Sequence, residues 1–305
     1  MLLGFAKAHA TNSNVDNYCY LFVTGYGAES VPGYFTENAI EVRQQGATNV
    51  TIIEPPTFTA VLDNVAFVKS EALKFLVSSQ MDGKKRKLIV VAHSKGGLEF
   101  LNTWLQNPND FSQEVLEMAV LVQSPLLGST YSDLSLGALE KSLRGTPGYQ
   151  DFETRHAGRI SLMSENVAKD LDQSSSSLTE SDISSISKRL FYWRSEKKAS
   201  FAPVLKSIEK VIKPLGENDG AVLTRNEMLT TLRGQTFGND LGITQGIDHH
   251  DVVAEDLNPS KFHLARIRRF TRQILQRVWN PNSKTSEHIE IETLSCQDFL
   301  KLPAN

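Results

Sequence analysis

Residues 87–100 read Lys-Leu-Ile-Val-Val-Ala-His-Ser-Lys-Gly-Gly-Leu-Glu-Phe. The first part is an apolar run rich in β-branched residues, which predicts a buried strand. Apolar residues then recur at helical spacing, at Leu98, Leu101, Trp104 and Leu105. The segment therefore predicts a strand, a tight turn and a helix, with Ser94 at the apex of the turn.

The residue types around Ser94 follow from the geometry of such a turn. A strained apical residue needs small residues two before and two after it, and these are Ala92 and Gly96. The turn exposes the Ser94 hydroxyl and puts the Lys95 N–H at the start of a helix, where negative charge is favoured. A simpler interpretation stays open on these residues alone, in which Ser94 only caps a helix after an ordinary strand.

The composition bounds the class of protein. The chain has 305 residues, of which 40% are hydrophobic and 22% charged, with a net charge of −3. This is typical of an ordinary globular protein with one large α/β domain or two smaller ones, and it gives no indication of nucleic-acid binding. We interpret Lys84–Lys87 as a solvated turn, and Arg266, Arg268 and Arg269 as the wet face of a C-terminal helix.

The two ends of the chain carry weaker signals. Ala8-His9-Ala10 fits a signal-peptide cleavage site, but no basic start precedes it, so residues 1–17 are interpreted as a loop and a candidate signal-peptide remnant. Residues 279–305 predict an extended tail with a short strand at 288–291. The two cysteines, Cys19 and Cys296, lie far apart in sequence, and their pairing is left open.

Between these ends, the residue patterns predict alternating strands and helices. Strands are predicted at 18–24, 49–54, 118–124 and 189–195, besides the strand that leads into Ser94. Helices are predicted at 37–45, 64–79, 134–143, 160–171 and 259–278, besides the helix that follows Ser94 to about residue 106. Strands alternating with helices predict a parallel sheet covered by helices.

Four further segments carry motifs. The strand at 18–24 ends in Thr24-Gly25-Tyr26-Gly27, and the strand at 118–124 runs into Pro125-Leu126-Leu127-Gly128-Ser129. Asn218-Asp219-Gly220 is turn chemistry, and Ile247-Asp248-His249-His250-Asp251-Val252 follows it. With the Ser94 turn, these segments resemble, in the same order, the motifs of bacterial triacylglycerol lipase-like α/β-hydrolases, although Thr24 stands where that family usually has histidine.

The resemblance implies a fold and a set of site residues. The fold is the α/β-hydrolase fold over residues 18–278, a mostly parallel doubly wound sheet with an inserted helical lid or cap at about 131–187. The implied catalytic residues are Ser94 as nucleophile, His249 as base and Asp219 as acid, with Glu217 as the fallback carboxylate. The backbone N–H groups of Tyr26 and Lys95 would form the oxyanion hole, and the implied substrate-binding residues are Gly25, Leu126 and Leu127.

The insertion contains a serine-rich run that begins with Ser174-Ser175-Ser176-Ser177. Low-complexity serine usually indicates a mobile, solvated loop. At this place in the fold we interpret the segment as a lid over the site, and a passive insertion is the alternative.

The implied function is hydrolysis of carboxylic esters, by a lipase or esterase that acts on acyl-glycerol or other lipid esters. A thioesterase or acyltransferase of the same fold, and a non-catalytic binding protein, stay open. No organic cofactor is needed. Asp251 matches one ligand of the calcium site in many such lipases, but Ala199 and Ser200 stand where another ligand is expected, so that site is only half matched.

The expected partners are a small-molecule or lipid ester and, transiently, a lipid interface. No nucleic-acid partner is expected, and the oligomeric state is left open. The resemblance favours an extracellular or periplasmic location, whereas the residues themselves leave a cytoplasmic one open.

Overall fold

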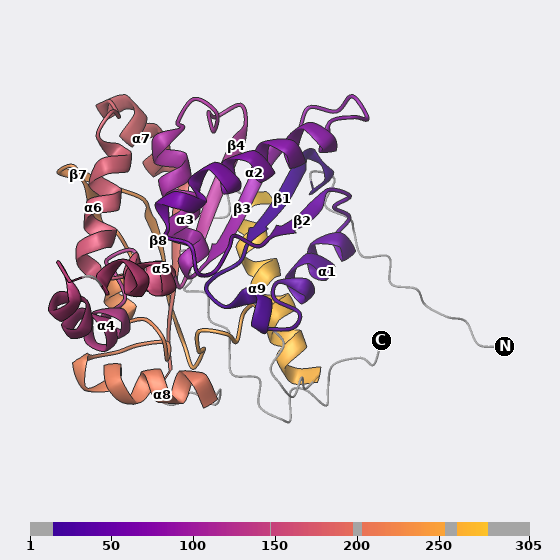
Figure 1. Ribbon diagram of the computed structural model, residues 1–305. Helices are drawn as coiled ribbons and strands as arrows, with labels where there is room; N and C mark the ends of the chain where they lie inside the picture. The colour runs from indigo at the N-terminus through magenta and orange to yellow at the C-terminus, as the bar shows by residue number, and fades with distance from the viewer. Residues whose placement is uncertain (1–14, 147, 198–202, 254–260, 280–305) are drawn as a thin grey trace.

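A sheet of six strands, in the order β2-β1-β3-β4-β5-β8, forms the centre of the molecule, and every neighbouring pair is parallel (Figure 1). The structure is a computed structural model that describes residues 15–146, 148–197, 203–253 and 261–279. The strands of this sheet are β1 (Tyr18–Val23), β2 (Val50–Ile53), β3 (Lys87–His93), β4 (Leu116–Val122), β5 (Leu190–Glu196) and β8 (Asn239–Gln245).

The strand that leads into Ser94 lies inside this sheet, as its apolar run predicts. All residues of β3 after Lys87 are buried. Val90 pairs with Leu21 of β1 on one side and with Ala119 of β4 on the other. Since all strands run in the same direction, the segments that follow β1, β3, β4 and β5 leave the sheet at the same end, where the carboxyl ends of the strands lie.

Helices cover both faces of the sheet. The helices are α1 (Thr36–Gln44), α2 (Val65–Ser79), α3 (Lys95–Gln106), α4 (Thr130–Leu143), α5 (Tyr149–Ile160), α6 (Ser164–Ser175), α7 (Glu180–Arg189), α8 (Pro203–Ile212) and α9 (Lys261–Trp279). Helices α2, α3, α6 and α7 share one hydrophobic core with the sheet, whereas α1 and α9 share the core on its other face. Short 3₁₀ turns lie at Val15–Asn17, Ala28–Ser30, Leu62–Asn64, Lys213–Leu215 and Thr224–Glu227.

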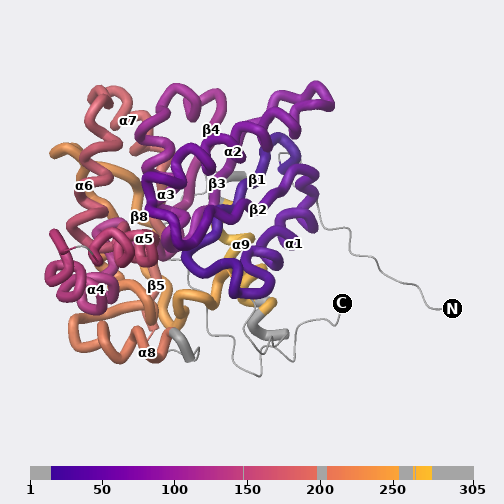
Figure 2. The backbone as a smooth tube through the Cα atoms, viewed as in Figure 1, coloured from indigo at the N-terminus to yellow at the C-terminus, as the bar shows by residue number. Residues whose placement is uncertain are grey.

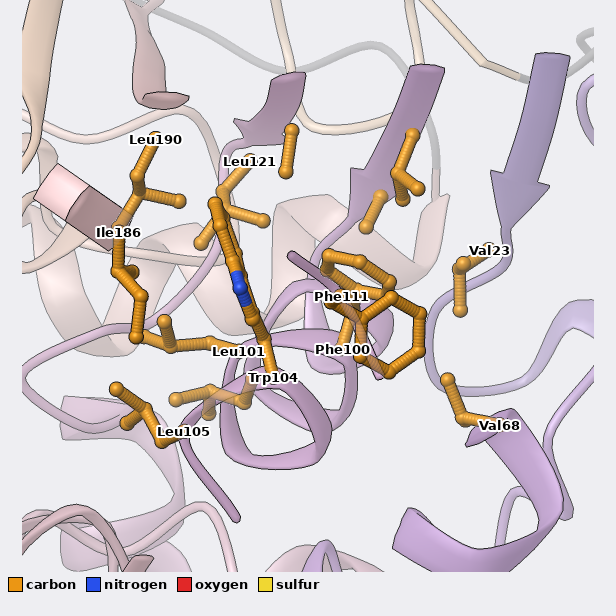
Figure 3. Packing of buried hydrophobic residues seen from close by; sticks show 14 of the residues in the cluster. Val23, Val68, Phe100, Leu101, Trp104, Leu105, Phe111, Leu121, Ile186 and Leu190 are labelled. Atoms are coloured by element: carbon orange, nitrogen blue, oxygen red, sulfur yellow. The ribbon is translucent and has the colours of Figure 1, made fainter. Parts of the chain in front are cut away.

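Helix α3 is buried along almost its whole length, because it lies between the sheet and other helices. In Figure 3, Trp104 and Phe100 of α3 lie in the core with Leu121 of β4 and Ile186 of α7. Trp104 and Phe100 have no exposed surface. This packing fixes the helix that begins directly after Ser94.

The inserted segment between β4 and β5 divides into two parts. Helices α4 and α5 build a small apolar cluster of their own, from Leu136, Phe152, Ile160 and Met163. Figure 2 shows α4, α5 and α8 together at one end of the molecule. Helices α6 and α7 instead belong to the main core. Helices α4 and α5 therefore form a part of the insertion with an apolar cluster separate from the main core.

The expectation that the serine-rich run is a mobile, solvated loop is wrong for its first two residues, whereas Ser176 and Ser177 lie exposed in the turn after α6. Ser174 and Ser175 form the last turn of α6, and both are buried. The Ser174 hydroxyl donates to Asn102 Oδ1 of α3 at 2.7 Å and accepts from Gln106 Nε2 at 3.0 Å. Small side chains let α6 approach α3 closely, and the hydroxyls are satisfied by that contact. The helix predicted at 160–171 is accordingly placed too early.

Each of the two basic clusters contains a residue that pairs with a distant group, although only Arg86 among them is buried. Arg86 is 2% exposed and bonds to the Asp16 carbonyl, the Ser79 carbonyl and the Asp82 carboxylate. On α9, Arg268 pairs with the buried Glu37 of α1 at 2.6 Å. A run of basic residues suggests a solvated surface, because the local sequence does not show the distant carboxylates that pair with it.

Among the elements that were not predicted are the helices α5 and α7, the strand β8, and the hairpin of β6 (Thr231–Leu232) with β7 (Gln235–Thr236). Strand β8 is mostly polar because it lies at the edge of the sheet and is partly exposed. Its apolar pattern is therefore too weak to be recognised in the sequence.

Several expectations concern residues outside the described ranges. These are the signal-peptide remnant, the tail after 279 with its short strand, and Cys296. Cys19 lies in β1 with its Sγ 2.7 Å from Ser79 Oγ, and burial raises the pKa of this thiol. Within the described ranges, none of the helices combines the length and the apolar character needed to cross a bilayer.

The contact between α3 and β1 generates a testable prediction. A Cβ atom on Gly96 would lie 2.2 Å from the Thr24 carbonyl oxygen and 2.8 Å from that of Val23. We expect Gly96→Ala to lower the free energy of unfolding by about 1–3 kcal/mol, since backbone atoms must move. The matched control is Gly137→Ala in α4, where the nearest neighbour is Met163 Cε at 3.5 Å. In the helix interior that change should be neutral or stabilising by up to about 1 kcal/mol in denaturant unfolding.

Candidate active site

Ser94 lies at the junction of β3 and α3 in a conformation that is rare for a residue with a side chain. Its backbone angles are φ 55° and ψ −128°. Such a conformation costs about 1–3 kcal/mol and persists only where the surrounding structure imposes it. Here the buried strand before Ser94 and the buried helix after it impose the conformation, and Ser94 itself is 8% exposed. The interpretation of Ser94 as a simple cap is not supported, because its side chain makes no capping hydrogen bond to α3.

The structure brings Ser94, His249 and Asp219 together. His249 Nε2 lies 2.9 Å from Ser94 Oγ, and His249 Nδ1 lies 2.5 Å from Asp219 Oδ2. With Nδ1–H donating to the carboxylate, Nε2 is free to accept the serine proton. No single local motif could show this arrangement, because the three residues come from three separate loops at the carboxyl ends of the strands.

The Asp219 loop orients the carboxylate. Asp219 Oδ1 accepts hydrogen bonds from the N–H groups of Ala221 at 2.8 Å and Val222 at 2.7 Å. The Asp219 carbonyl also accepts the His249 N–H at 2.8 Å. One oxygen of the carboxylate is thus held by its own loop and the other faces the histidine. The fallback carboxylate, Glu217, is exposed, and its backbone carbonyl bonds to Thr224 N–H.

The segment after β1 lies against Ser94. A Cβ on Gly25 would lie 2.8 Å from Ser94 Cβ, so only glycine allows this approach. The N–H groups on either side of Tyr26 are engaged, since Gly25 N–H donates to Tyr34 Oη at 3.1 Å and Gly27 N–H to Thr57 Oγ1 at 3.1 Å. The Tyr26 N–H has no acceptor among the described residues. Lys95 is the first residue of α3, so no helical carbonyl precedes it to accept its N–H.

The side chain of Lys95 has a role that the sequence did not indicate. Its Nζ donates to the carbonyls of Pro56 at 3.3 Å, Thr57 at 3.1 Å and Thr59 at 2.7 Å. It also pairs with the buried Glu99 at 2.8 Å. The lysine therefore fixes the loop after β2 over the start of α3.

The loop after β2 in turn contacts two neighbours of the site. Phe58 packs edge to face against Tyr26, with ring centroids 6.1 Å apart. The Phe58 carbonyl accepts the N–H of Gly158 in α5 at 2.9 Å, and a Cβ on Gly158 would lie 2.2 Å from the Thr57 carbonyl oxygen. Helix α5 is thus docked directly on the loop that borders Tyr26.

A chain of buried polar groups runs behind Ser94, and sequence reasoning missed it. Tyr34 Oη lies 2.5 Å from His93 Nδ1, and His93 Nε2 lies 3.0 Å from Gln123 Oε1. Gln123 Nε2 donates to Ser195 Oγ at 2.5 Å and to the Asp248 carbonyl at 3.0 Å. Burial, and then the nearby His249, lower the pKa of His93 well below its usual value. A neutral His93 thus links the segments that carry Gly25, Ser94 and His249.

The two leucines implied as substrate-binding residues differ in their surroundings. Leu126 is completely buried in the main hydrophobic core, whereas Leu127 is 46% exposed. The position of Leu126 in the core argues for a packing role, so only Leu127 keeps a surface that a substrate could contact. Thr24, at the position where histidine is usual, is buried with its hydroxyl lacking a partner among the described residues.

Glu227 is a second buried carboxyl group near Asp219. Its Oε2 accepts the Ser195 N–H at 3.0 Å, and its Oε1 has no partner among the described residues. Burial, followed by the charge of Asp219, raises the pKa of Glu227 well above its usual value. Glu227 therefore holds its proton more tightly than an ordinary glutamate does.

The surroundings of Asp251 do not fit a bound calcium ion. Its carboxylate lies 2.9 Å from Lys197 Nζ and 3.0 Å from Arg266 Nη1. A metal cation at this carboxylate would be repelled by both side chains. The described residues contain no group of three or more side chains that could hold a metal ion. Ala199 and Ser200 lie outside the described residues.

The lowered pKa of His93 predicts how stability depends on pH. Below about pH 6.5 the unfolded chain binds a proton at this residue and the folded chain does not. The free energy of unfolding should therefore fall on acidification, by up to about 1.4 kcal/mol per pH unit. Denaturant unfolding between pH 5 and 7 measures this slope, and His93→Gln should flatten it. An unchanged slope in His93→Gln would contradict the assignment, and His156→Gln on α5 is the control.

The raised pKa of Glu227 predicts the opposite dependence. Above about pH 4.5 the unfolded chain loses this proton and the folded chain keeps it, so the residue destabilises the fold increasingly as pH rises. We expect Glu227→Gln to raise the melting temperature, and to raise it more at pH 8 than at pH 5. The control is Glu41→Gln, which removes the partner of Arg272 and should lower the melting temperature at pH 8. A Glu227→Gln effect that shrinks as pH rises would show that Glu227 is ionised.

Comparison with known proteins gives matches at the level of structure. No family model matches the chain, and no curated protein matches it. A metagenomic carboxyl esterase matches with a TM-score of 0.62 at 17% sequence identity, over 88% of this chain and 76% of that chain. The mature form of the lipase BlEst2 from Bacillus licheniformis matches with a TM-score of 0.58 at 18% identity, over 87% of this chain and 92% of that chain.

A third match is the phospholipase PlaB from Legionella pneumophila, in complex with thio-NAD. Its TM-score is 0.54 at 13% identity, over 87% of this chain and 63% of that chain. At these identities a structural match shows the fold alone. The chain therefore has the α/β-hydrolase fold that these esterases and lipases share, as the order of its motifs predicts.

Proposed function

We propose that this protein is a serine hydrolase of carboxylic esters, a lipase or esterase. The observation that carries the proposal is the pair of distances at His249, 2.9 Å to Ser94 Oγ and 2.5 Å to Asp219 Oδ2. A nucleophile next to a base, with the base oriented by a carboxylate, is the arrangement that activates serine for acyl transfer. The similarity in fold to esterases and lipases supports the same reaction class.

In the first half of the reaction, Ser94 Oγ attacks the ester carbonyl carbon. His249 Nε2 accepts the hydroxyl proton, and Asp219 stabilises the imidazolium that forms. The N–H groups of Tyr26 and Lys95 stabilise the negative charge that develops on the carbonyl oxygen. His249 then protonates the leaving alcohol, which leaves an acyl group on Ser94.

In the second half, water attacks the acyl carbon. His249 takes a proton from this water and then gives it to Ser94 Oγ as the bond between the acyl carbon and Oγ breaks, which releases the carboxylic acid and restores Ser94 and His249. Ser94, His249 and Asp219 thus carry both halves, and neither half requires a metal or an organic cofactor.

The distribution of exposed apolar side chains favours an ester with an apolar acyl chain. Several such residues lie in segments that follow the carboxyl ends of β2, β4 and β5, at the edge of the sheet where Ser94 lies. They are Phe58, Leu127, Leu134, Leu139, Val211 and Leu215. Apolar surface around a site favours lipid-like substrates and transient contact with a lipid interface.

The test is hydrolysis of p-nitrophenyl esters from acetyl to palmitoyl, with the wild type beside Ser94→Ala. We expect hydrolysis by the wild type and a loss of at least about 1,000-fold in kcat for Ser94→Ala, because the nucleophile is gone. A preference for long chains would identify a lipase, and an optimum at short chains a carboxylesterase. Ser78→Ala, which changes an exposed serine of α2, is the matched control.

Labelling with a fluorophosphonate probe separates the rival functions. If the folded protein hydrolyses no ester and Ser94 does not react with the probe, the proposal is wrong, and a binding role gains support. If Ser94 reacts but no ester is hydrolysed, a thioesterase or acyltransferase is indicated instead.

A further inference from the structure

The turn that carries His249 contains two carboxylates that meet a single ammonium group. Lys197 Nζ lies 3.0 Å from Asp248 Oδ2 and 2.9 Å from Asp251 Oδ2. All three side chains are nearly buried, with 9%, 4% and 12% of their surfaces exposed, respectively. The lysine therefore holds the residue directly before His249 and the residue two after it.

Both carboxylates also shape the turn itself. Asp251 Oδ2 accepts the Asp248 N–H at 3.0 Å. Asp248 Oδ1 accepts the N–H groups of His250 at 3.1 Å and Asp251 at 3.1 Å. The backbone of the turn is thus bound by the same carboxylates that the ammonium binds, so a shift of either carboxylate moves the backbone of His249.

Two cations face the two carboxylates of this turn. Asp248 and Asp251 bring two carboxylates close together, and Arg266 of α9 adds a second cation, 3.0 Å from Asp251 Oδ2. Although burial acts to raise the pKa of Asp248, Lys197 and the His250 N–H lower it below its usual value. Buried carboxylates repel each other strongly unless a cation neutralises them.

Lys197 reaches the acid loop as well as the histidine turn. It follows β5 directly, and its backbone N–H donates to the Asn218 carbonyl at 2.9 Å, one residue before Asp219. The carbonyl of the preceding Glu196 accepts the Gly246 N–H at 2.8 Å, at the start of the histidine segment. One residue therefore connects β5 to the loops of both Asp219 and His249.

We propose that Lys197 is a positioning residue for His249 and serves as the built-in cation of the histidine turn, so that the reaction needs no divalent metal there. This inference rests on the proposed ester hydrolysis for its kinetic readout. The ammonium lies between the carboxylates of Asp248 and Asp251. Its removal takes away the cation that both carboxylates share, and the turn should then shift His249 away from Ser94.

The test compares Lys197→Met with the wild type, Lys197→Arg and the charge-matched double variant Lys197→Met/Asp248→Asn. We expect Lys197→Met to lower kcat roughly 10- to 100-fold with little change in KM, because a displacement of about 1 Å at a reacting group costs on the order of 100-fold. Lys197→Arg, which keeps the charge, and the double variant should each recover most of kcat. Lys74→Met, at an exposed lysine of α2, is the control and should change nothing.

The wild type is also assayed in EDTA and in calcium chloride. Activity that is unchanged by both supports the inference. Loss of activity in EDTA with recovery in calcium would overturn it, since the cation would then be a metal. An unchanged kcat in Lys197→Met would overturn it too.

A stability measurement keeps this test separate from that of the proposed function. If the wild type hydrolyses no ester, the proposed function fails, but melting temperatures of the wild type, Lys197→Met, Asp248→Asn and the double variant still measure the coupling of Lys197 to Asp248. A double variant that is more stable than Lys197→Met supports the built-in cation. Additive effects of the two changes would contradict it.

Discussion

The close contact between the start of α3 and the end of β1 is the constraint on which the rest of the site depends. Gly96 lies so near the Thr24 carbonyl that no side chain fits between them. Near this contact Ser94 has its strained conformation, and Gly25 lies against it. The Ser94 hydroxyl and the backbone of the Gly25–Tyr26 segment thus come close together, because β1 and β3 are neighbours and their carboxyl ends lie at the same end of the sheet.

Buried polar groups then hold together the loops that follow the carboxyl ends of the strands. The chain from Tyr34 through His93 and Gln123 to the Asp248 carbonyl connects three of them by hydrogen bonds. Each group in it is removed from water, so each stabilises the structure only while its partner is in place. Two lysines contribute in a similar way, since Lys95 binds the carbonyls of the loop after β2 and Lys197 binds the carboxylates of the histidine turn. Polar contacts between the loops therefore hold the site together above the apolar core.

Local sequence was enough for the elements whose apolar pattern is strong. Strand β3 and helix α3 were predicted because burial on both sides requires a continuous apolar strand and an apolar helix stripe. Strand β8 was not predicted, because an exposed edge strand needs no continuous apolar pattern. Ser174 was misread because its hydroxyl bonds to Asn102 and Gln106, which lie in another helix. Arg86 was misread for the same reason, since its partners include Asp16, far away in the sequence.

For the site, the residue types and their order can be read from the sequence: a serine between two small positions, then an aspartate in a turn, then a histidine beside two further aspartates. Turn sterics act on neighbouring residues, so these features can be recognised locally. The folded chain brings Ser94, Asp219 and His249 together, packs Leu126 in the core, and places Lys197 between Asp248 and Asp251. Those outcomes depend on distances between residues that are remote in sequence, and such distances are set by the order of strands in the sheet and by the packing of helices on its faces.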